Sequence, residues 1–270
     1  MENYIIYTFI FLLGLAIGSF LNVVIYRLPK GEEIVIKPSH CMKCGERIKP
    51  YDLLPVISYI ILRGKCRYCG EKFSIQYLLV ELLTAISLVG IYFAFGWTSP
   101  ADTIAMMVLV SMFIAIFVID VYHYIIPNEI IVFGLVSGVI FSILKGVNFN
   151  NLSLFNWDVL KDSGLGLVVG ISVFFLIVIL GEWFMKAEAM GMGDVKLMGV
   201  VGLFLGFKLT VLSMFLAFII GSIISIFLLV TKIKGRRDQI PFGPFIVLGS
   251  MVAAIWGTQI LSWYFSLGRI

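Results

Sequence analysis

Long apolar runs separated by short polar stretches make up most of this chain. A helix needs about 20 apolar residues to cross the hydrocarbon core of a bilayer. Backbone groups in hydrocarbon must also pair within the protein, which such runs achieve as helices. We read spans near residues 4–26, 77–95, 104–120, 125–144, 164–185, 194–207, 209–231 and 243–265. The pattern predicts an all-α polytopic membrane protein with about eight transmembrane helices.

The composition agrees with this class of protein. Of the 270 residues, 60% are hydrophobic and only 13% are charged, and the mean hydropathy is +1.05. A soluble domain carries about 25% charged residues, so this chain has too few to cover a surface that faces water. The first apolar run follows Met-Glu-Asn, with no basic region before it and no small-residue cleavage site after it. We therefore expect that run to remain as an anchor.

The distribution of Lys and Arg predicts the orientation. Sixteen of the twenty lie in three segments, 27–72, 186–196 and 232–237, and the other four are Lys145, Lys161, Lys208 and Arg269. Short cytoplasmic loops carry an excess of these residues. An eight-span topology with both termini outside puts all sixteen in the cytoplasm. The net charge of +4 is then a consequence of topology and gives no reason to invoke nucleic acid.

Residues 27–76 contain the one long polar stretch and all four cysteines. The cysteines form two CxxC pairs with 21 residues between them: Cys41, Cys44, Cys66 and Cys69. This spacing is close to that of zinc ribbons with four thiolate ligands, and Gly45 and Gly70 allow the tight turn that follows each pair. Disulfides are rare in a reducing cytosol, so two bridges, or four free buried thiols, are weaker alternatives. We expect a closed, structural zinc site, with the neighbouring His40 solvated and not a ligand.

These segments predict three domains. Residues 1–26 form the first transmembrane helix, 27–76 a cytoplasmic zinc-binding domain, and 77–270 a transmembrane bundle. A domain of about 50 residues buries little core by itself. We therefore expect the metal to hold the small domain together.

Two acidic residues lie where the membrane makes charge costly. Asp120 ends the third predicted span, in IAIFVIDVYHYIIPNE, and Asp194 opens the sixth, in GMGDVKLMG. Ionisable residues within spans indicate function by default, and the topology puts both at the cytoplasmic ends of their helices, where they could meet. Helix capping is the alternative for Asp194. It does not suit Asp120, because the C-terminal end of a helix disfavours an anion.

If the two carboxylates meet, their chemistry is constrained. Two such groups a few ångströms apart share a proton and titrate as a pair. One then acts as base on a water, and the other donates to the carbonyl oxygen of a peptide bond. Gly191 and Gly193 would let an extended substrate backbone approach the acid, since they carry no Cβ. Lys196 either steers a substrate carboxylate or extends to the membrane interface, and we favour the interface.

Five blocks of sequence, taken together, resemble one known family. They are GSFLNVVIYRLP (18–29), CMKCGERIKPYDLLPVISYIILRGKCRYCGEKFSIQYLLVELLTA (41–85), IDVYHYIIPN (119–128), GMGDVKLMG (191–199) and IPFGPFIVLG (240–249). The chain resembles the bacterial type IV prepilin leader peptidases, which are GxGD aspartic proteases of membranes. GxGD alone is a weak signal in a chain with 26 glycines. The other four blocks in the same order make the resemblance specific.

The resemblance implies an enzyme of the bacterial cytoplasmic (inner) membrane with its active site facing the cytoplasm. It would remove the basic leader from prepilins and pseudopilins, cutting after a glycine. Asp120 and Asp194 would be the catalytic pair, and the four cysteines the metal ligands. Family members with the long cytoplasmic domain also methylate the new N-terminus with S-adenosylmethionine. A peptidase without methyltransferase activity is the alternative.

One position departs from the family pattern, and the methyl-donor site has no assigned residues. The family often has Pro-Asp where this chain has Pro127-Asn128, so we interpret Asn128 as a helix cap. Residues 27–75 contain no Gly-rich nucleotide loop, and the residues that bind the methyl donor stay unassigned. Glu81 could serve this domain or the amine of the substrate, or simply pack between helices.

Three other functions compete with the peptidase. An ion-coupled transporter would also keep acids in the membrane, but we see no repeated halves in the sequence. A scaffold of a pilus or secretion apparatus would explain the cysteines but not the paired aspartates. An archaeal-type preflagellin peptidase would keep the aspartates and lack the cysteine domain. The sequence does not identify the substrates or the oligomeric state.

Overall fold

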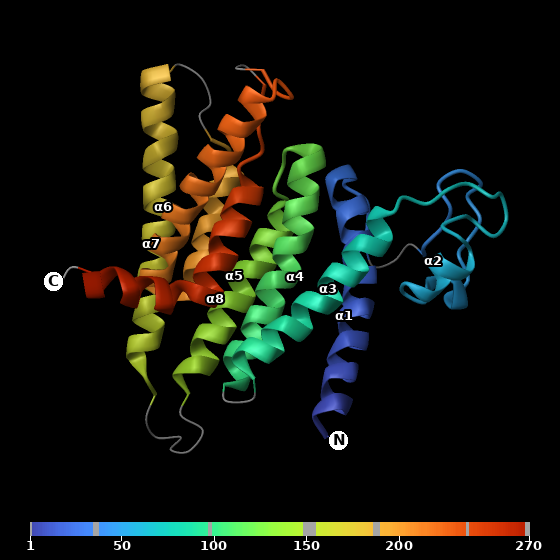
Figure 1. Cartoon of the computed structure of the whole chain (residues 1–270), viewed down its shortest axis with the longest axis horizontal. Coiled ribbons are helices and arrows are strands. Elements are labelled where there is room, and N and C mark those ends of the chain that lie inside the picture. The colour runs from blue at the N-terminus through green and yellow to red at the C-terminus, as the bar shows by residue number, and fades with distance from the viewer. Residues whose placement is uncertain are drawn as a thin grey trace. The chain divides into compact units, whose positions relative to one another are not determined.

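The structure is a computed structural model that describes residues 2–34, 38–96, 99–147, 155–185, 190–235 and 238–267. Long helices dominate it (Figure 1): α1 Glu2–Arg27, α3 Gln76–Phe95, α4 Pro100–His123, α5 Asn128–Gly146, α6 Trp157–Met185, α7 Met192–Val230 and α8 Gly243–Leu267. Three short elements lie between α1 and α3: η1 Leu28–Lys30, η2 Pro50–Leu53 and α2 Ile57–Ile61.

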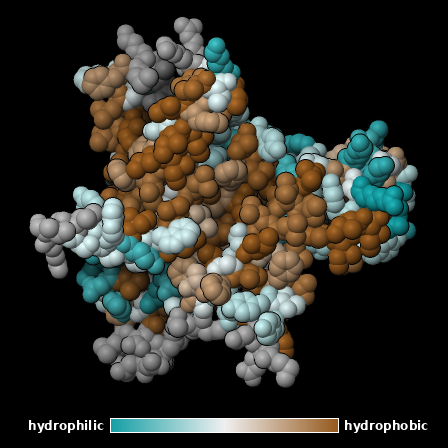
Figure 2. Space-filling model, viewed as in Figure 1, coloured by the Kyte–Doolittle hydropathy of each residue, from teal (hydrophilic) through white to brown (hydrophobic). Residues whose placement is uncertain are grey.

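Seven helices of the described residues are long and apolar enough to cross a membrane. The predicted all-helical membrane fold is confirmed, with the cysteines between its first two long helices. Figure 2 shows apolar side chains over most of the helices, with hydrophilic ones gathered on the cysteine-bearing segment and in a second group at the lower left. Five charges used for the predicted orientation, Lys37, Lys186, Arg236, Arg237 and Arg269, lie outside the described residues.

The chain divides into two compact units, Met1–Ala115 and Ile116–Ile270. In the first unit, α1 and α3 pack with their backbones in contact. A Cβ at Gly14 would lie 2.5 Å from Ala85 Cα, and one at Gly18 would lie 2.6 Å from Glu81 Cα. Small residues permit such close approach between membrane helices. The three predicted domains, with boundaries after 26 and 76, stay predictions.

In the second unit, α7 reverses direction at Gly206. This glycine has φ 75° and ψ 176°, a conformation outside the helix that favours glycine because it has no Cβ. Phe207 N–H donates to Asp162 Oδ1 at the start of α6, 3.3 Å away. Leu209 then packs on Gly257 toward the end of α8, whereas Gly221 packs on Phe245 near its start. Residues 207–230 therefore run back along the bundle, antiparallel to 192–205.

This reversal agrees with the two separate spans that the sequence predicts in this region. The sequence predicted about eight spans, with 194–207 and 209–231 separate, and α7 consists of two helical segments joined at the non-helical Gly206. The break lies two residues before the predicted boundary at residue 208. The chain turns at a single residue, so no polar loop separates the segments.

The first half of α7 packs very closely against α6. A Cβ at Gly170 would lie 2.5 Å from Met198 O, and one at Gly166 would lie 2.9 Å from the carbonyl carbon of Gly206. A Cβ at Gly166 would also clash with the backbone of Gly202. The half of α7 that begins with Asp194 is therefore fixed by backbone contact with α6.

We expect Gly166→Ala to destabilise the second unit by about 1–3 kcal/mol, because overpacking against a backbone cannot be relieved by a change of rotamer. Thermal unfolding in detergent would show this as a lower Tm. Gly164→Ala is the matched control, since it lies on the same helix and its Cβ would meet nothing within 4 Å. Equal Tm values for the two variants would contradict this packing.

Candidate active site and metal centre

Asp120 and Asp194 both lie in the second unit. Asp120 is in the last turn of α4 and Asp194 in the first turn of α7. Their exposed fractions are 5% and 8%, and they are near enough to interact electrostatically. Two carboxylates from separate helices, both buried and within range of each other's charge, are costly unless they share a proton.

The start of α8 holds Asp120 in place. Gly243 N–H donates to Asp120 Oδ2 at 3.0 Å, and a helix N-terminus carries partial positive charge that favours an anion. A Cβ at Gly243 would lie 2.5 Å from the same oxygen. Glycine at this position therefore lets the end of α8 sit directly against the carboxylate.

Asp194 lies in the first turn of α7 but is not its N-cap residue. The N-cap of α7 is Gly191, with φ −71° and ψ 144°. Asp194 lies three residues later, and its N–H donates to Gly191 O at 3.1 Å. The Asp194 carboxylate also interacts with the backbone N–H of Gly191, and a carboxylate in the first turn suits the helix dipole.

The two glycines of the GxGD motif differ in their surroundings. A Cβ at Gly193 would lie 3.1 Å from Ile126 Cβ, so this glycine packs against the segment that follows α4. A Cβ at Gly191 would meet Asp194 Oδ2 at 3.6 Å as its nearest neighbour, which is ordinary van der Waals contact. The folded protein therefore needs a small residue at Gly193 but has room for a side chain at Gly191.

Asn128 is not the predicted helix cap, and its side chain bonds to Lys196. Lys196 Nζ donates to Asn128 Oδ1 at 2.8 Å, so it bonds to the protein as well as lying at an exposed position. The N-cap of α5 is Pro127, and Asn128 is the first residue of the helix. Asn128 is therefore not a cap, and its side chain instead ties the start of α5 to the first turn of α7.

The four cysteines come together in the first unit. One Sγ atom from each lies within 4.8 Å of all the others, and the cysteines form no disulfide. The two CxxC turns have matching backbones: Gly45 N–H donates to Cys41 O at 2.9 Å, and Gly70 N–H to Cys66 O at 3.0 Å. Gly45 and Gly70 have φ of 71° and 70°, in the left-handed region.

This arrangement fits zinc. An ion with tetrahedral bonds of about 2.3 Å to sulfur holds its sulfurs about 3.8 Å apart, and the Sγ atoms of Cys41 and Cys69 are 3.7 Å apart. Backbone N–H groups of Cys44 and Lys43 lower the pKa of Cys41 to about 6, which favours the thiolate that binds metal. His40 is outside the cluster, and its Nδ1 lies 3.2 Å from Pro38 O.

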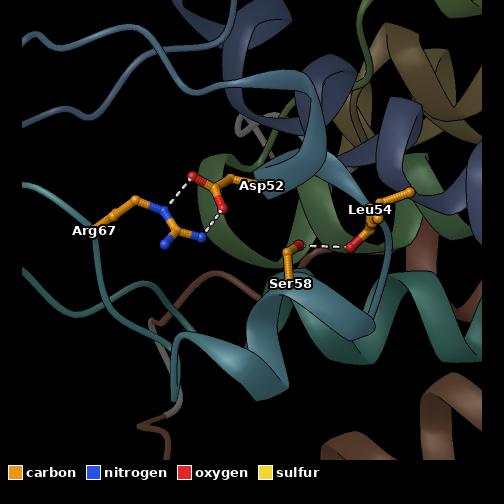
Figure 3. A network of polar contacts seen from close by, with 4 residues as sticks. All are labelled: Asp52, Leu54, Ser58 and Arg67. Atoms are coloured by element: carbon orange, nitrogen blue, oxygen red, sulfur yellow. Dashed lines mark hydrogen bonds and ion pairs between the residues drawn. The ribbon is translucent and has the colours of Figure 1, made fainter.

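An ion pair joins the second CxxC turn to the segment between the two turns. Arg67 Nε lies 2.8 Å from Asp52 Oδ2, and Arg67 Nη2 lies 2.5 Å from Asp52 Oδ1 (Figure 3). The guanidinium lowers the pKa of the Asp52 carboxyl. Ser58 Oγ donates to Leu54 O at 2.5 Å and closes the turn before α2. These contacts order a segment that has little apolar core.

Two protein-family models match this chain. Residues 12–95 match the bacterial peptidase A24 N-terminal domain, and residues 107–226 match the type IV leader peptidase family. A prepilin leader peptidase/N-methyltransferase of Pseudomonas putida is 30% identical over 282 residues, which cover 96% of this chain and 94% of that protein. The chain belongs to the type IV leader peptidase family. Membership of a peptidase family makes it an enzyme.

Other relatives of this chain carry the same name. The prepilin leader peptidase/N-methyltransferase of Pseudomonas aeruginosa PAO1 is 32% identical, covering 94% of this chain and 91% of that protein. The protein of that name from Xanthomonas campestris pv. campestris is also 32% identical, covering 93% and 92%. No solved structure matches the chain. The cysteines fall within the first matched segment and both aspartates within the second.

Sequence reasoning missed the contact between Gly243 and Asp120. A signal was present, because the block IPFGPFIVLG places Gly243 directly before Pro244, a residue favoured in the first turn of a helix. That signal predicts a helix start but not its neighbour, which is 123 residues away in sequence.

Proposed function

We propose that this member of the leader peptidase family removes the basic leader from prepilins and pseudopilins, with Asp120 and Asp194 as a proton-sharing catalytic pair. One observation carries the proposal: two buried carboxylates on separate helices lie at one place in the second unit, where Ile126 packs against both Gly243, which binds Asp120, and Gly193, which precedes Asp194. The names of the curated relatives supply the substrate class. A transporter or a scaffold would not account for both the paired carboxylates and the names of the relatives.

Each carboxylate has a role in peptide hydrolysis. We assign the base to Asp120, whose Oδ2 is bound by the N–H of Gly243 at the positive end of α8. Asp120 takes a proton from water, the oxygen of that water bonds to the carbonyl carbon, and Asp194 gives its proton to the carbonyl oxygen. When the carbon–nitrogen bond breaks, the leaving amine takes up a proton from Asp120. Asp194 regains its proton as the carbonyl re-forms, and the pair returns to its starting state.

The site lies at the end of the bundle that we propose faces the cytoplasm of a bacterial inner membrane. Asp120, Asp194 and Gly243 share that end. Because α7 reverses at Gly206, its first and last turns also lie there, with Lys196 near the first and Lys232 just after the last. Cytoplasmic ends carry an excess of Lys and Arg. In this orientation the cut falls after a glycine, between the basic leader and the apolar helix of the substrate, which stays in the lipid.

We propose that the first unit carries the second activity, methylation of the new N-terminus, with residues 27–76 as its zinc-stabilised domain. S-Adenosylmethionine supplies a methyl group on a sulfonium: the amine nitrogen bonds to the methyl carbon, the carbon–sulfur pair stays on sulfur, and the amine loses one proton. Zinc here has a structural role, since four cysteine ligands leave no open position.

Mass spectrometry of a co-expressed prepilin tests both activities. We expect the wild-type enzyme to yield a substrate that lacks its leader and carries one extra methyl group. A substrate that loses only its leader would support the alternative of a peptidase without methyltransferase activity. An intact leader on a prepilin that another family member does process would refute the proposal.

Substitution of Gly191 tests whether this glycine serves packing of the protein or approach of the substrate. We expect Gly191→Ala to lower the Tm only slightly, because alanine is a poorer N-cap than glycine but the added Cβ has no close neighbour. We expect kcat/KM for leader removal to fall by about tenfold or more, because the methyl group would stand between the substrate backbone and Asp194. Unchanged kcat/KM would show that the substrate does not approach over this glycine.

A further inference from the structure

The first unit contains a cavity of about 840 Å³. Its walls come from α1, α3 and the cysteine-bearing segment, all within Met1–Ala115. Sites for small ligands have volumes of about 300–1,000 Å³ and combine apolar walls with a few polar groups. The cavity is therefore large enough for a nucleoside-sized ligand, and the peptidase chemistry in the second unit does not use it.

Asn22 of α1 presents an unused acceptor at the wall of this cavity. Its exposed fraction is 4%, and its Nδ2 donates to Tyr77 O at 2.9 Å. Its Oδ1 is buried and accepts no hydrogen bond from the residues that the structure describes. Buried polar atoms nearly always have a partner. This oxygen lies just beneath the wall without a partner, and an N–H or O–H group of a ligand that reached it would satisfy it.

Glu81 of α3 adds a buried carboxylate to the same wall. Its exposed fraction is 7%, and Oε2 accepts from Val56 N–H at 2.8 Å. Among the residues that the structure describes, its partners are Val56 N–H and the Ser19 hydroxyl, and none is a cationic side chain. A buried anion is strongly stabilised by a positive charge. The inner wall thus favours a ligand that has both hydrogen-bond donors and a positive charge.

Most other charged side chains of the wall already have partners. Lys43 pairs with Glu71 at 2.5 Å, and Asp52 pairs with Arg67. Arg27 donates to three backbone carbonyls, those of Glu33, Ile34 and Pro38. Lys65 and Lys72 also line the cavity and are exposed, so they are available to a ligand carboxylate.

Aromatic side chains complete the wall. Tyr26, Tyr59, Phe73 and Tyr77 all line the cavity, and Phe73 and Tyr77 meet edge to face with centroids 6.4 Å apart. Flat aromatic surfaces bind planar bases by stacking. The wall can therefore bind a nucleobase through its aromatic rings, a sulfonium through Glu81, and the carboxylate of an amino acid through Lys65 and Lys72.

We infer that this cavity binds the methyl donor, with Asn22 Oδ1 accepting a hydrogen bond from it and the Glu81 carboxylate facing its sulfonium. The inference rests on the proposed methyltransferase activity and locates its donor site. Glu81 then serves the methyl donor in the first unit and takes no part in the peptidase chemistry of the aspartate pair. An anionic phosphate group fits worse, because Asn22 Oδ1 and Glu81 can only repel it.

Binding of S-adenosylmethionine and S-adenosylhomocysteine to the full-length, zinc-loaded enzyme in nanodiscs tests the inference by calorimetry. We expect Asn22→Leu to weaken both ligands about tenfold, because each loses the same hydrogen bond. Glu81→Gln keeps an acceptor for Val56 N–H but has no charge. It should weaken S-adenosylmethionine about tenfold and the uncharged thioether of S-adenosylhomocysteine much less.

Two further variants keep the test decisive. Ala16→Trp fills the cavity without removing a polar group and should abolish binding of both ligands. Thr84→Val is the matched control, because Thr84 lies on α3, is fully buried, bonds only to Val80 O at 2.7 Å and does not line the cavity. It should bind both ligands as the wild type does. Zinc content would show that each variant keeps a folded first unit.

The outcomes separate this inference from the proposed function. If the wild type binds the donor and methylates prepilin, but Asn22→Leu, Glu81→Gln and Ala16→Trp bind it equally well, the donor site lies elsewhere and only the inference fails. If the wild type binds no donor and adds no methyl group while still removing leaders, the proposed methyltransferase activity fails and the inference falls with it.

Discussion

Asp120→Asn and Asp194→Asn will each abolish leader removal while the helices stay folded. Each variant leaves one carboxylate without the partner with which it shares a proton, so neither the base nor the acid can complete its step. General acid–base groups that act as a unit lose most of their rate when either is removed, and we expect a fall of about 10³-fold or more. The mass of a co-expressed prepilin, read over a time course, measures it.

The two variants should fold because asparagine keeps the size of aspartate. In Asp120→Asn the amide oxygen can still accept from Gly243 N–H, and removing a buried charge relieves a desolvation cost. Asp102→Asn is the matched control, since Asp102 lies at the other end of the same helix and should keep full activity. Leader removal by either catalytic variant at a rate near that of the wild type would exclude the aspartate pair as the mechanism.

Removing the metal will unfold the cysteine-bearing segment and stop methylation. Four thiolates around one ion supply about 10 kcal/mol or more of folding free energy at neutral pH, far more than a segment of this size gains from its apolar core. We expect either a strong chelator or Cys66→Ser to make residues 38–75 sensitive to protease. Limited proteolysis with mass spectrometry would report the loss of folding, and metal analysis the loss of zinc. The mass of a co-expressed prepilin would report the loss of methylation.

The neighbouring histidine provides the control for the metal site. His40→Ala should keep one zinc per chain and the protease resistance of the wild type, because His40 lies outside the cysteine cluster. A metal-free protein that resists protease as well as the loaded one would show that the segment folds without zinc. Loss of zinc in His40→Ala would show that histidine shares the site.

The sequence was sufficient for features that depend on local patterns. Apolar runs of membrane length identified the helices, because hydrocarbon allows few other structures. The CxxC pairs and the glycines after them identified the metal site, because each turn is built from residues adjacent in sequence. The positions of Asp120 and Asp194 at helix ends also followed from the apolar runs around them.

Contacts between distant segments were decided only by the tertiary structure. At the reversal, Phe207 N–H bonds to Asp162. Gly243 N–H bonds to Asp120, and Lys196 bonds to Asn128. In each case the partner lies far away in the chain, and no local preference specifies which helix faces which. The cavity beside Asn22 and Glu81 is of the same kind, because it forms only where α1 and α3 meet through Gly14 and Gly18. Hydrophobicity and spacing determined which segments enter the membrane, and side-chain packing between helices determined which groups meet there.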